Sequence, residues 1–453
     1  MQTTTAREPA QASSSRYAWY VVGVLTLCYM LSFIDRQILS LLVTPIKRDL
    51  GVSDTRVGLL QGLAFAIFYG LAGLPLGRLV DTRNRRNLVI AGVALWSAFT
   101  CACSGAKSFV SLFLARIGVG VGEASLNPAA FSIISDYFPP ERLATATSVF
   151  YLGALLGSGL AFAVGGTIVD AVTKMGPIDL PVLGSIAPWR LTFLTVGVPG
   201  LLVALLVATV REPLRRNLRA IEASVAKPPF RELAMEIRRR WKSLAGISIS
   251  MACQASRLYG FIAWAPTFFV RVHHWSPGEA GRALGLVTIV CGCSGMLVGG
   301  RLSDSWQSKG ISDGPLRVGV IGAIGCGLLL SAAFAVTNLT WTLTLLGAAL
   351  FFNCLPMGSA VAALQMIYPN QMRGLVSAIF LLVLNLGGLS LGPLLPGVFN
   401  DYLFRNEARL GASMSLSNAI ASVFMLAALL PVLGPYRKDY WAAGLGRSKV
   451  SPE

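Results

Sequence analysis

The chain is poor in charge, in histidine and in paired cysteine motifs. Only 13% of its 453 residues are charged, roughly half the share of an ordinary soluble domain, whereas 54% are hydrophobic. The two histidines are adjacent at 273 and 274, so no histidine cluster can hold zinc or serve a catalytic triad. The eight cysteines form no Cys-x-x-Cys pair, and we expect them to be buried apolar side chains. These shortages exclude zinc enzymes and histidine-dependent hydrolases, and we expect neither a metal nor a cofactor.

The few charges are unevenly balanced. Lys and Arg number 38 against 21 Asp and Glu, which gives a formal net charge of +17. Nucleic-acid-binding proteins carry such an excess in dense patches on soluble domains. Here the charges lie between long apolar runs, so the sequence predicts a membrane protein with no nucleic-acid partner.

Twelve apolar runs reach the roughly 20 residues that a membrane-spanning helix needs. An even number of spans places both termini on one side of the membrane. With the termini inside, the inner segments hold 25 basic and 12 acidic residues and the outer loops hold 10 and 7. The positive-inside rule therefore predicts a multi-pass membrane protein with both termini in the cytoplasm. The predicted spans are 18–43, 57–80, 87–105, 109–135, 143–169, 188–210, 243–271, 280–301, 316–336, 339–366, 374–399 and 412–434.

The longest predicted loop divides the spans into six and six. It holds ten basic and four acidic residues, and we expect it to be a tether attracted to anionic lipid rather than a regulatory element. The predicted segments are a disordered cytoplasmic tail at 1–16, an N-terminal six-helix bundle at 17–210, a cytoplasmic linker at 211–242, a C-terminal six-helix bundle at 243–436 and a cytoplasmic tail at 437–453.

The two predicted bundles share an internal repeat. Gly-Arg-Leu-x-Asp stands at 77–81, after the second span, and again at 300–304, after the eighth. A second match opens the fifth and eleventh spans, where Arg142 and Arg373 are separated by nearly the same offset. Two copies of a six-helix unit in the same orientation are typical of parallel-repeat transporters.

The first copy of the repeat resembles the signature loop of the major facilitator superfamily, Gly-x-Leu-x-Asp-x-Arg-x-x-Arg at 77–86. The resemblance implies an all-α membrane protein of 12 transmembrane helices, in which two pseudo-symmetric six-helix bundles surround a central cavity that opens alternately inward and outward. In that family the loop charges hold the bundles together on the cytoplasmic side. The resemblance therefore assigns an inner gate to Gly77, Asp81, Arg83, Arg86, Arg142, Asp304 and Arg373.

Two other segments resemble the Spinster family of lysolipid and sphingolipid-phosphate transporters, as a bacterial-type member, and this resemblance implies the bacterial inner (plasma) membrane. They are Ile-Asp-Arg at 34–36 in the first span and Arg-Ile-Gly-Val-Gly-Val-Gly-Glu at 116–123 in the fourth. Ser32 and Phe33 stand where that family usually has Asn-Tyr. Bacterial organic-anion symporters share parts of the same pattern.

Five charged residues fall inside the predicted spans, where each costs about 2.5–3.5 kcal/mol unless water or a partner is near. At 1.5 Å rise per residue, Asp35 and Arg116 both lie within about 10 Å of the outer face and can meet. Glu123 lies two turns deeper on the same stripe as Arg116. Arg257 follows Asp35 by nearly the repeat offset, so we expect it at the pseudo-symmetric position across the cavity.

This charge pattern suggests a mechanism. We expect Asp35 to be the proton-coupling site and Glu123 an auxiliary one, with Arg36, Arg116 and Arg257 binding an anionic head group. The alternative is that Asp35 and Arg116 only neutralise each other and fix helix packing. Four aromatic side chains are candidates for an apolar half of the cavity, although packing in the core or against lipid is equally compatible with each: Phe131, Tyr151, Tyr259 and Trp264.

The sequence contains no phosphate-binding loop, so an ion gradient or the substrate's own gradient must drive transport. The predicted function is proton-coupled transport of an amphiphilic anion such as a lysophospholipid, and the alternative is proton-coupled symport of small organic anions. A membrane-embedded lipid enzyme is disfavoured because no histidine lies in any span. An opening between the fifth and eighth spans would favour a lipid. We expect a monomer whose partners are its substrate, the proton and membrane lipids.

Overall fold

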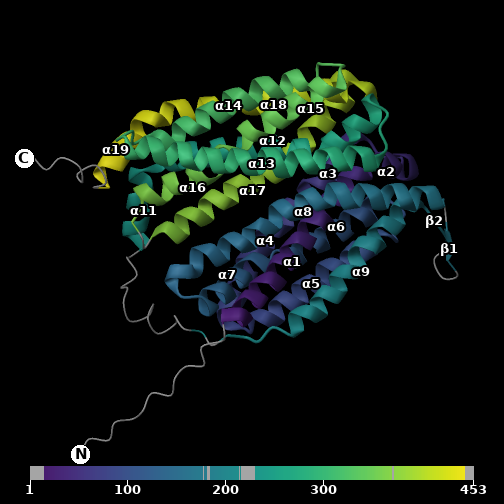
Figure 1. The fold of residues 1–453 in the computed structure, drawn as a ribbon, viewed down its shortest axis with the longest axis horizontal. Helices are drawn as coiled ribbons and strands as arrows, with labels where there is room; N and C mark the ends of the chain where they lie inside the picture. The colour runs from purple at the N-terminus through teal and green to yellow at the C-terminus, as the bar shows by residue number, and fades with distance from the viewer. Residues whose placement is uncertain are drawn as a thin grey trace, which may run out of the picture.

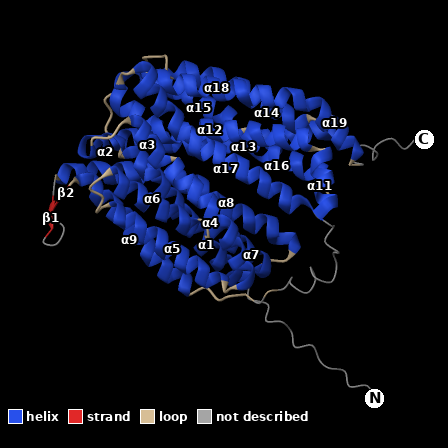
Figure 2. Ribbon diagram, turned by 180° about the vertical axis from the view of Figure 1, so that it is seen from behind, coloured by secondary structure: helices blue, strands red, loops and turns tan. Residues whose placement is uncertain are grey.

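The computed structural model is a bundle of long, roughly parallel helices with one short hairpin (Figures 1 and 2). The structure describes residues 15–176, 178–180, 184–213, 215, 230–369 and 372–443. The first half contains α1 (Ser15–Leu41), α2 (Val43–Leu50), α3 (Asp54–Gln61), α4 (Leu63–Thr82), α5 (Arg85–Cys103), α6 (Phe109–Glu123), α7 (Leu126–Tyr137), α8 (Pro140–Met175), the antiparallel strands β1 (Ile178–Leu180) and β2 (Gly184–Ile186), and α9 (Pro188–Ala208). The second half contains α11 (Phe230–Arg239), α12 (Trp241–Val272), α13 (Pro277–Ser308), α14 (Gly314–Ala333), α15 (Leu339–Cys354), α16 (Pro356–Ile367), α17 (Arg373–Val398), η2 (Phe399–Phe404), η3 (Glu407–Arg409), α18 (Leu410–Leu429), η4 (Leu430–Val432) and α19 (Leu433–Ala442).

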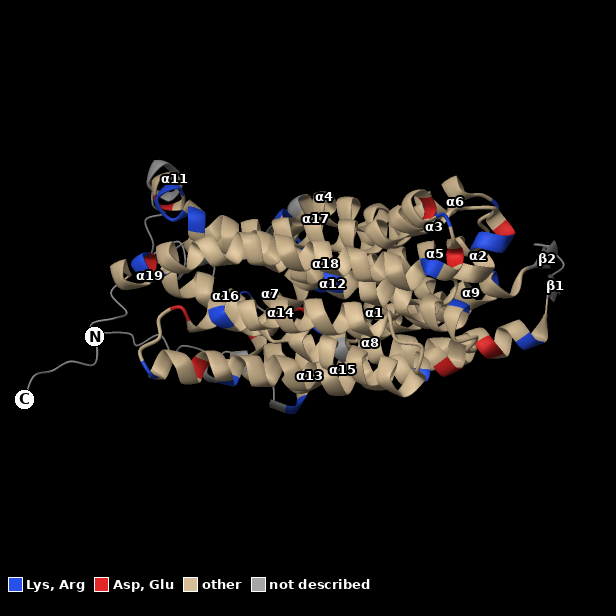
Figure 3. Cartoon of the chain, turned by 90° about the horizontal axis from the view of Figure 1, so that it is seen from above, with Lys and Arg blue, Asp and Glu red and all other residues tan. Residues whose placement is uncertain are grey.

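The helices match the predicted spans. Within the described residues, 11 helical segments are long and apolar enough to cross a membrane. The seventh predicted span is α12, which has 32 residues and carries Arg257 in its middle. Charged side chains gather at the two ends of the bundle and are sparse between them (Figure 3). The predicted fold of twelve transmembrane helices is consistent with this arrangement.

Several predicted boundaries differ from the structure. Three spans are each made of two helices, as at Leu355, where the following Pro356 cannot donate a backbone hydrogen bond. The fifth span is longer than predicted, since α8 has 36 residues. The predicted first tail overlaps the start of α1, and residues 437–442 of the predicted last tail are helical. Residues 1–14, 214, 216–229 and 444–453 of the predicted tails and linker lie outside the described residues.

The two ends of the bundle differ. We call the end that carries α11 and α19 the terminal end, and the end that carries α2 and the hairpin the distal end (Figure 1). At the distal end the two halves pack closely, because a Cβ atom on Gly58 of α3 would lie 2.6 Å from the carbonyl oxygen of Pro393 in α17. A Cβ atom on Gly285 of α13 would lie 2.7 Å from the carbonyl oxygen of Gly159 in α8. Glycine is therefore required at both crossings.

The buried apolar residues show the same difference between the ends. One core cluster joins both halves at the distal end, and it includes Leu39 and Leu112 from the first half and Trp264 and Phe268 from the second. The cluster at the terminal end of the first half takes only Leu389 from the second half among its buried members. The corresponding cluster of the second half takes no residue from the first among those described. The halves are therefore joined at the distal end and separate toward the terminal end.

Candidate functional site

A buried ion pair lies between the first and fourth spans. Arg36 of α1 donates from Nε to Glu123 Oε2 at 2.6 Å, and its terminal nitrogen lies 2.5 Å from the same oxygen. Ser32, one turn earlier, donates to that oxygen at 2.8 Å. The Glu123 side chain is fully buried and its other carboxylate oxygen has no hydrogen-bond partner. Arg36 therefore supplies the counter-charge of the Glu123 carboxylate, and one of the two carboxylate oxygens is left without a hydrogen bond.

Aromatic rings enclose the remaining faces of the Arg36 guanidinium. Its central carbon lies 4.4 Å from the ring centre of Phe65, 5.0 Å from Phe33 and 5.2 Å from Tyr69. Each of these contacts attracts a cation to the face of the ring. Asn127 fixes Tyr69 by donating to its hydroxyl at 3.1 Å. Arg36 is therefore positioned by one carboxylate and three rings.

Arg36 also borders a small cavity of about 40 Å³ between the two halves. The unpaired amide atoms Gln37 Oε1 and Gln61 Nε2 belong to residues in its wall. The cavity is lined by Phe33, Arg36, Gln37, Ser40, Gln61 and Phe65 from the first half and by Tyr259, Ile262, Ala263, Leu389 and Pro393 from the second. Tyr259 therefore faces the same cavity as Arg36 from the other half, and its role in substrate binding stays a prediction.

Arg116 contacts Asp35 through the backbone of Asp35 and not through its carboxylate. Both are buried, and Arg116 donates to the backbone carbonyl of Asp35 at 3.1 Å. Among the described residues, the Asp35 carboxylate forms no ion pair. The expected ion pair between the Asp35 and Arg116 side chains is therefore wrong. Glu123 pairs with Arg36, and the Arg116 guanidinium donates to a backbone carbonyl. Rise per residue fixed the depth of these groups but not the direction of their side chains.

Arg257 does not reach the cavity beside Arg36. It donates to the Ala323 carbonyl at 3.2 Å, to the Ser422 hydroxyl at 3.1 Å and to the Met425 sulfur at 3.2 Å, all inside the second half. Tyr259, two residues later, faces the cavity, and two residues turn a helix by about 200°. The expectation that Arg257 faces the central cavity is therefore wrong, since the repeat offset indicated its level and not its direction.

Of the other predicted aromatic residues, Phe131 and Tyr151 belong to a partly exposed cluster of rings, whereas Trp264 lies in the core. Phe131 and Tyr151 lie 5.4 Å apart between ring centres, and Tyr151 is 50% exposed. Tyr29 links them to Arg36, since its ring lies 6.4 Å from Tyr151 and 5.2 Å from Phe33. Trp264 is fully buried and donates to the Pro393 carbonyl at 2.7 Å, so it joins α12 to α17 and does not line the cavity beside Arg36.

The residues of the predicted inner gate make no contact between the halves in the described part of the chain. Gly77 has open space beside it, and Arg83, Arg142 and Asp304 are exposed and form no ion pair there. Arg86 contacts Asn87 at 3.0 Å and the Val210 carbonyl at 3.5 Å, both in its own half. The side chains of Asp81 and Arg373 lie outside the described residues. Their gate role stays a prediction for a form closed at this end.

Sequence reasoning missed Arg85, which lies directly before Arg86. Arg85 is 1% exposed, pairs with Asp136 of α7, and donates from Nε to Glu212 at 2.7 Å. A further donor reaches the Pro213 carbonyl at 2.9 Å. Arg85 thereby ties the start of α5 to α7 and to the chain that follows α9. The basic run at 83–86 indicated a functional segment, but only the burial of Arg85 in the structure distinguishes it from its exposed neighbour Arg83.

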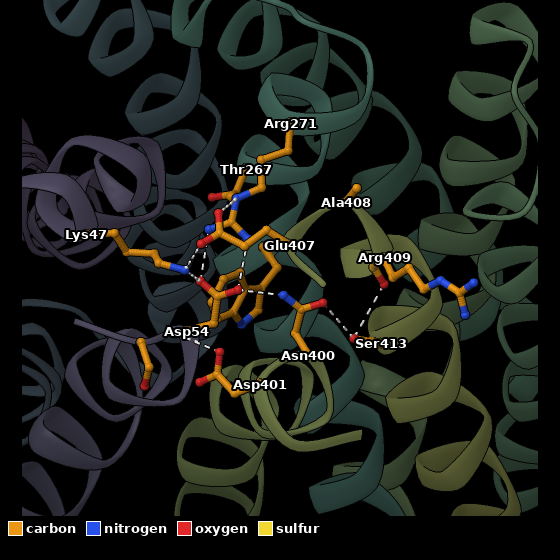
Figure 4. A network of polar contacts seen from close by, with 12 residues as sticks. Lys47, Asp54, Thr267, Arg271, Asn400, Asp401, Glu407, Ala408, Arg409 and Ser413 are labelled. Carbon is orange, nitrogen blue, oxygen red and sulfur yellow. Dashed lines mark hydrogen bonds and ion pairs between the residues drawn. The ribbon is translucent and has the colours of Figure 1, made fainter. Parts of the chain in front are cut away.

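A second network, at the distal end, joins the two halves around a buried carboxylate (Figure 4). Asp54, the first residue of α3, accepts from Lys47 at 2.6 Å and from two nitrogens of Arg271 in α12 at 2.9 Å each. Asn400 of η2 donates to it at 2.7 Å. No sequence pattern indicated this network, because its members come from segments far apart in the chain. We call Asp54, Lys47, Arg271 and Asn400 the distal latch.

Two further acidic residues, Glu407 and Asp401, extend the distal latch. Glu407 accepts from Lys47 at 2.8 Å, and its side chain is 66% exposed. Asp401 accepts from the backbone of Thr55 at 2.7 Å. The ion pairs that join the two halves in the described residues, Lys47 with Glu407 and Arg271 with Asp54, both lie in this region. Ion pairs and apolar packing therefore join the two halves at the same end of the bundle, the distal end.

Comparison with known proteins decides the family. Residues 25–392 match the Major Facilitator Superfamily. The chain belongs to this superfamily. It is therefore an integral, multi-pass membrane transporter and not an enzyme.

The transporter is similar over nearly its whole length to several individual members of the superfamily. It is 28% identical over 435 residues to an MFS-type efflux pump of Mycolicibacterium smegmatis, covering 95% of this chain and 96% of that one. It is 28% identical over 446 residues to the human protein spinster homolog 1, covering 91% and 78%. It is 24% identical over 425 residues to a hexuronate transporter of Bacillus subtilis, covering 91% and 95%.

The transporter is also similar to a solved structure. A bacterial homolog of the human lysosomal transporter Spinster, in an inward-facing and unoccupied conformation, matches with a TM-score of 0.77 and 26% identity over 97% of this chain and all of that one. The resemblance to the Spinster type predicted from the first and fourth spans is thus confirmed. The arrangement of this transporter, joined at the distal end, resembles that inward-facing form.

Replacing Arg85 of the transporter by methionine is expected to lower its free energy of unfolding by about 3–5 kcal/mol, because the buried carboxylate of Asp136 and the partly buried one of Glu212 lose their partner. The thermal unfolding midpoint of the purified protein measures this effect. The matched control is Arg83→Met, since Arg83 is exposed, and it should change stability by no more than about 0.5 kcal/mol. Equal midpoints for the two variants would contradict the structural role of Arg85.

Proposed function

We propose that this transporter is a proton-coupled secondary active carrier of an amphiphilic anion, such as a lysophospholipid or a related phosphate-bearing lipid. It works by alternating access, with the terminal end facing the cytoplasm of a bacterial cell. The observation that carries the proposal is the aromatic surface that leads away from Arg36. Ring contacts run from Phe33 through Tyr29 to Tyr151, at 5.2 Å and 6.4 Å between ring centres.

The anionic head group binds at Arg36 in this proposal. Guanidinium groups bind phosphate and carboxylate through parallel hydrogen bonds. Arg36 is only 13% exposed and borders the cavity between the halves, so an anion there would contact both. Arg116 donates to the backbone carbonyl of Asp35 and in this way holds the segment of α1 that carries Arg36. Tyr259 offers a hydroxyl from the opposite half.

The apolar tail lies along the aromatic surface. Tyr29, Phe131 and Tyr151 extend from Arg36 toward the terminal end, where the halves separate. Half of the Tyr151 side chain is exposed, so this surface is open to a ligand. A polar substrate would gain little from three such rings, whereas an acyl chain gains about 0.8 kcal/mol for each buried methylene.

Helices α8 and α13 supply a route for a lipid from the side. They cross closely at Gly159 and Gly285, with the Cβ space at Gly285 blocked at 2.7 Å. The other close glycine contacts between these helices, of Gly281 with Phe162 and of Gly166 with Pro277, lie on the distal side of this crossing. We expect the route of the lipid to lie on its terminal side. An opening between these two spans is the feature that favours a lipid over a small organic acid.

The two buried carboxylates have different surroundings, which supports different roles. Glu123 is neutralised by Arg36, while Asp35 has no ion-pair partner in the described residues. A proton taken up at Asp35 breaks no ion pair, so Asp35 is the proton-coupling site in this proposal. A proton on Glu123 releases Arg36 toward the substrate, which makes Glu123 the auxiliary site.

Small organic anions are the second candidate. Several relatives carry names of acid-sugar transporters, among them the hexuronate transporter of Bacillus subtilis. The unpaired amides of Gln37 and Gln61 in the wall of the cavity are suited to hydroxyl groups. Competition decides between the classes. Uptake of radiolabelled lysophosphatidylglycerol into proteoliposomes should saturate and resist excess glucuronate, whereas saturable glucuronate uptake without lysolipid uptake would favour the second candidate.

Removing two rings from the aromatic surface tests the placement of the tail. The double variant Phe131→Ala, Tyr151→Ala is expected to raise the KM for lysophosphatidylglycerol by about tenfold, since a few methylenes lose their apolar contact. The KM for glycerol 3-phosphate, if it is carried, should not change, because it has no tail. Leu328→Ala, an exposed site on α14 in the other half, is the control. An unchanged lysolipid KM in the double variant would exclude this surface.

A further inference from the structure

Two carboxylates at the distal end each cap a helix of the opposite half. Asp170, near the end of α8, accepts from the Ser276 hydroxyl at 3.0 Å and from the backbone nitrogen of Gly278 at 3.1 Å, at the start of α13. Asp401, in η2 directly after α17, accepts from the backbone nitrogen of Thr55 at 2.7 Å, at the start of α3 (Figure 4). The first turn of a helix has backbone donors without partners in the helix, and its dipole favours negative charge. Each carboxylate therefore completes a helix of the other half, and we call Asp170 and Asp401 the distal caps.

The internal repeat relates the two distal caps. Asp401 follows Asp170 by the offset that relates the openings of the fifth and eleventh spans. Gly278 follows Thr55 by the offset that separates the two Gly-Arg-Leu-x-Asp copies. Both the acceptor and the donor of the first cap thus recur at the equivalent positions of the second.

The close packing beside the caps is repeated as well. A Cβ atom on Gly58 of α3 would lie 2.6 Å from the carbonyl oxygen of Pro393 in α17, and one on Gly281 of α13 would lie 2.1 Å from that of Phe162 in α8. The same two offsets relate Gly58 to Gly281 and Phe162 to Pro393. The crossing of α3 with α17 and the crossing of α13 with α8 are therefore two copies of one contact.

The ion pairs of the distal latch are not repeated. Pro277 stands in the second half where Asp54 stands in the first, so the crossing of α8 with α13 has no equivalent buried carboxylate. Among the described residues at the distal end, the hydrogen bonds that join α8 to α13 and to the Ser276 cap before it all go to Asp170. The distal caps are thus the polar contact that both crossings share.

We propose that Asp170 and Asp401 are positioning residues for transport, which hold the distal end closed and are released together when it opens. Each cap joins one half to the other, so its hydrogen bonds break when the halves separate at that end. The freed backbone donors of α3 and α13 then turn to water. Because the two caps occupy equivalent positions of the repeat, one rocking movement of the halves breaks both. The proposal concerns the movement of the halves and does not depend on the identity of the substrate.

Spin labels at the exposed positions Lys174 and Arg405, one in each half, measure the ratio of distally open to distally closed molecules in the purified full-length protein. Asp170→Ala and Asp401→Ala are each expected to raise this ratio by about fivefold, the effect of a typical lost helix cap, and the double variant by about 25-fold. Ser53→Ala is the matched control, because the Ser53 hydroxyl caps α3 from within the same half by accepting from Arg56. It weakens the same helix start but should leave the ratio unchanged.

Gly278→Ala tests the first cap from the other half. A Cβ atom at Gly278 would lie 2.1 Å from Asp170 Oδ2, so the carboxylate has to move away from the start of α13. The variant should therefore reproduce the ratio of Asp170→Ala and add nothing to it when the two are combined. An unchanged ratio in the double variant of the caps, a double variant no more open than either single one, or an equal shift in Ser53→Ala would overturn the proposal.

Discussion

Asp35→Asn is expected to abolish the response of lysolipid accumulation to a pH gradient. A gradient of about two pH units supplies about 2.7 kcal/mol for each proton, enough for a roughly 100-fold accumulation of substrate. The asparagine has nearly the same shape but cannot take up a proton, so the variant should equilibrate the substrate without concentrating it. Uptake by proteoliposomes at a series of imposed gradients measures the effect.

Two variants complete the test of Asp35. Asp49→Asn removes an acid outside the cavity, one that pairs with Arg190 at 2.8 Å, and should keep the gradient response. Glu123→Gln frees Arg36 of its ion pair and should change the substrate KM. A wild-type gradient response in Asp35→Asn would refute its role in coupling and leave the alternative, in which Asp35 and Arg116 only fix the packing of α1 and α6.

Asp54→Asn is expected to open the distal end. The substitution leaves Lys47 and Arg271 without their shared buried partner, which costs about 3–5 kcal/mol in the form closed at that end. That loss shifts the balance between the distally closed and distally open forms by at least about 100-fold. Spin labels at the exposed positions Arg48 and Arg405 report the change, because the distance between them should lengthen in the variant.

Glu407→Gln is the matched control for Asp54→Asn. Glu407 pairs with the same lysine, but its side chain is 66% exposed, and exposed pairs contribute about 0–1 kcal/mol. Its spin-label distances should therefore resemble those of the wild type. Short distances in Asp54→Asn, or equal lengthening in both variants, would show that the distal latch does not hold the two halves together.

The fold was predictable because its signals are local. Each span is visible as an apolar run, and the repeat at 77–81 and 300–304 fixes the division into two sets of six. Boundaries were less predictable, because breaks such as the one before Pro356 and the length of α8 depend on neighbouring helices. Family membership could be predicted because the signature loop is a sequence feature.

The site was predictable only in part, for a geometric reason. Charged residues inside apolar runs identified Asp35, Arg36, Arg116, Glu123 and Arg257 as functional candidates. Which of them meet depends on how each helix is rotated, and sequence spacing does not give that rotation for two different helices. This is why Arg36 instead of Arg116 holds a carboxylate, and why Arg257 turns into its own half.

The gates show a further limit. The distal latch joins segments from opposite halves of the chain, so no spacing in the sequence relates Asp54 to Arg271. At the terminal end the basic run offered several arginines, and burial selects Arg85. The predicted inner gate needs a closed terminal end, and its contacts are not formed in a conformation whose halves separate there. The structure therefore shows the distal latch but not the inner gate.

The most direct test of the central claim is whether substrate and protons move together. Proteoliposomes holding a pH-sensitive dye, with no imposed gradient, should show an internal pH change when lysophosphatidylglycerol is added. The change should saturate with the lipid and be absent in Asp35→Asn. Saturable lysolipid uptake with no change of internal pH would contradict proton-coupled transport by this protein.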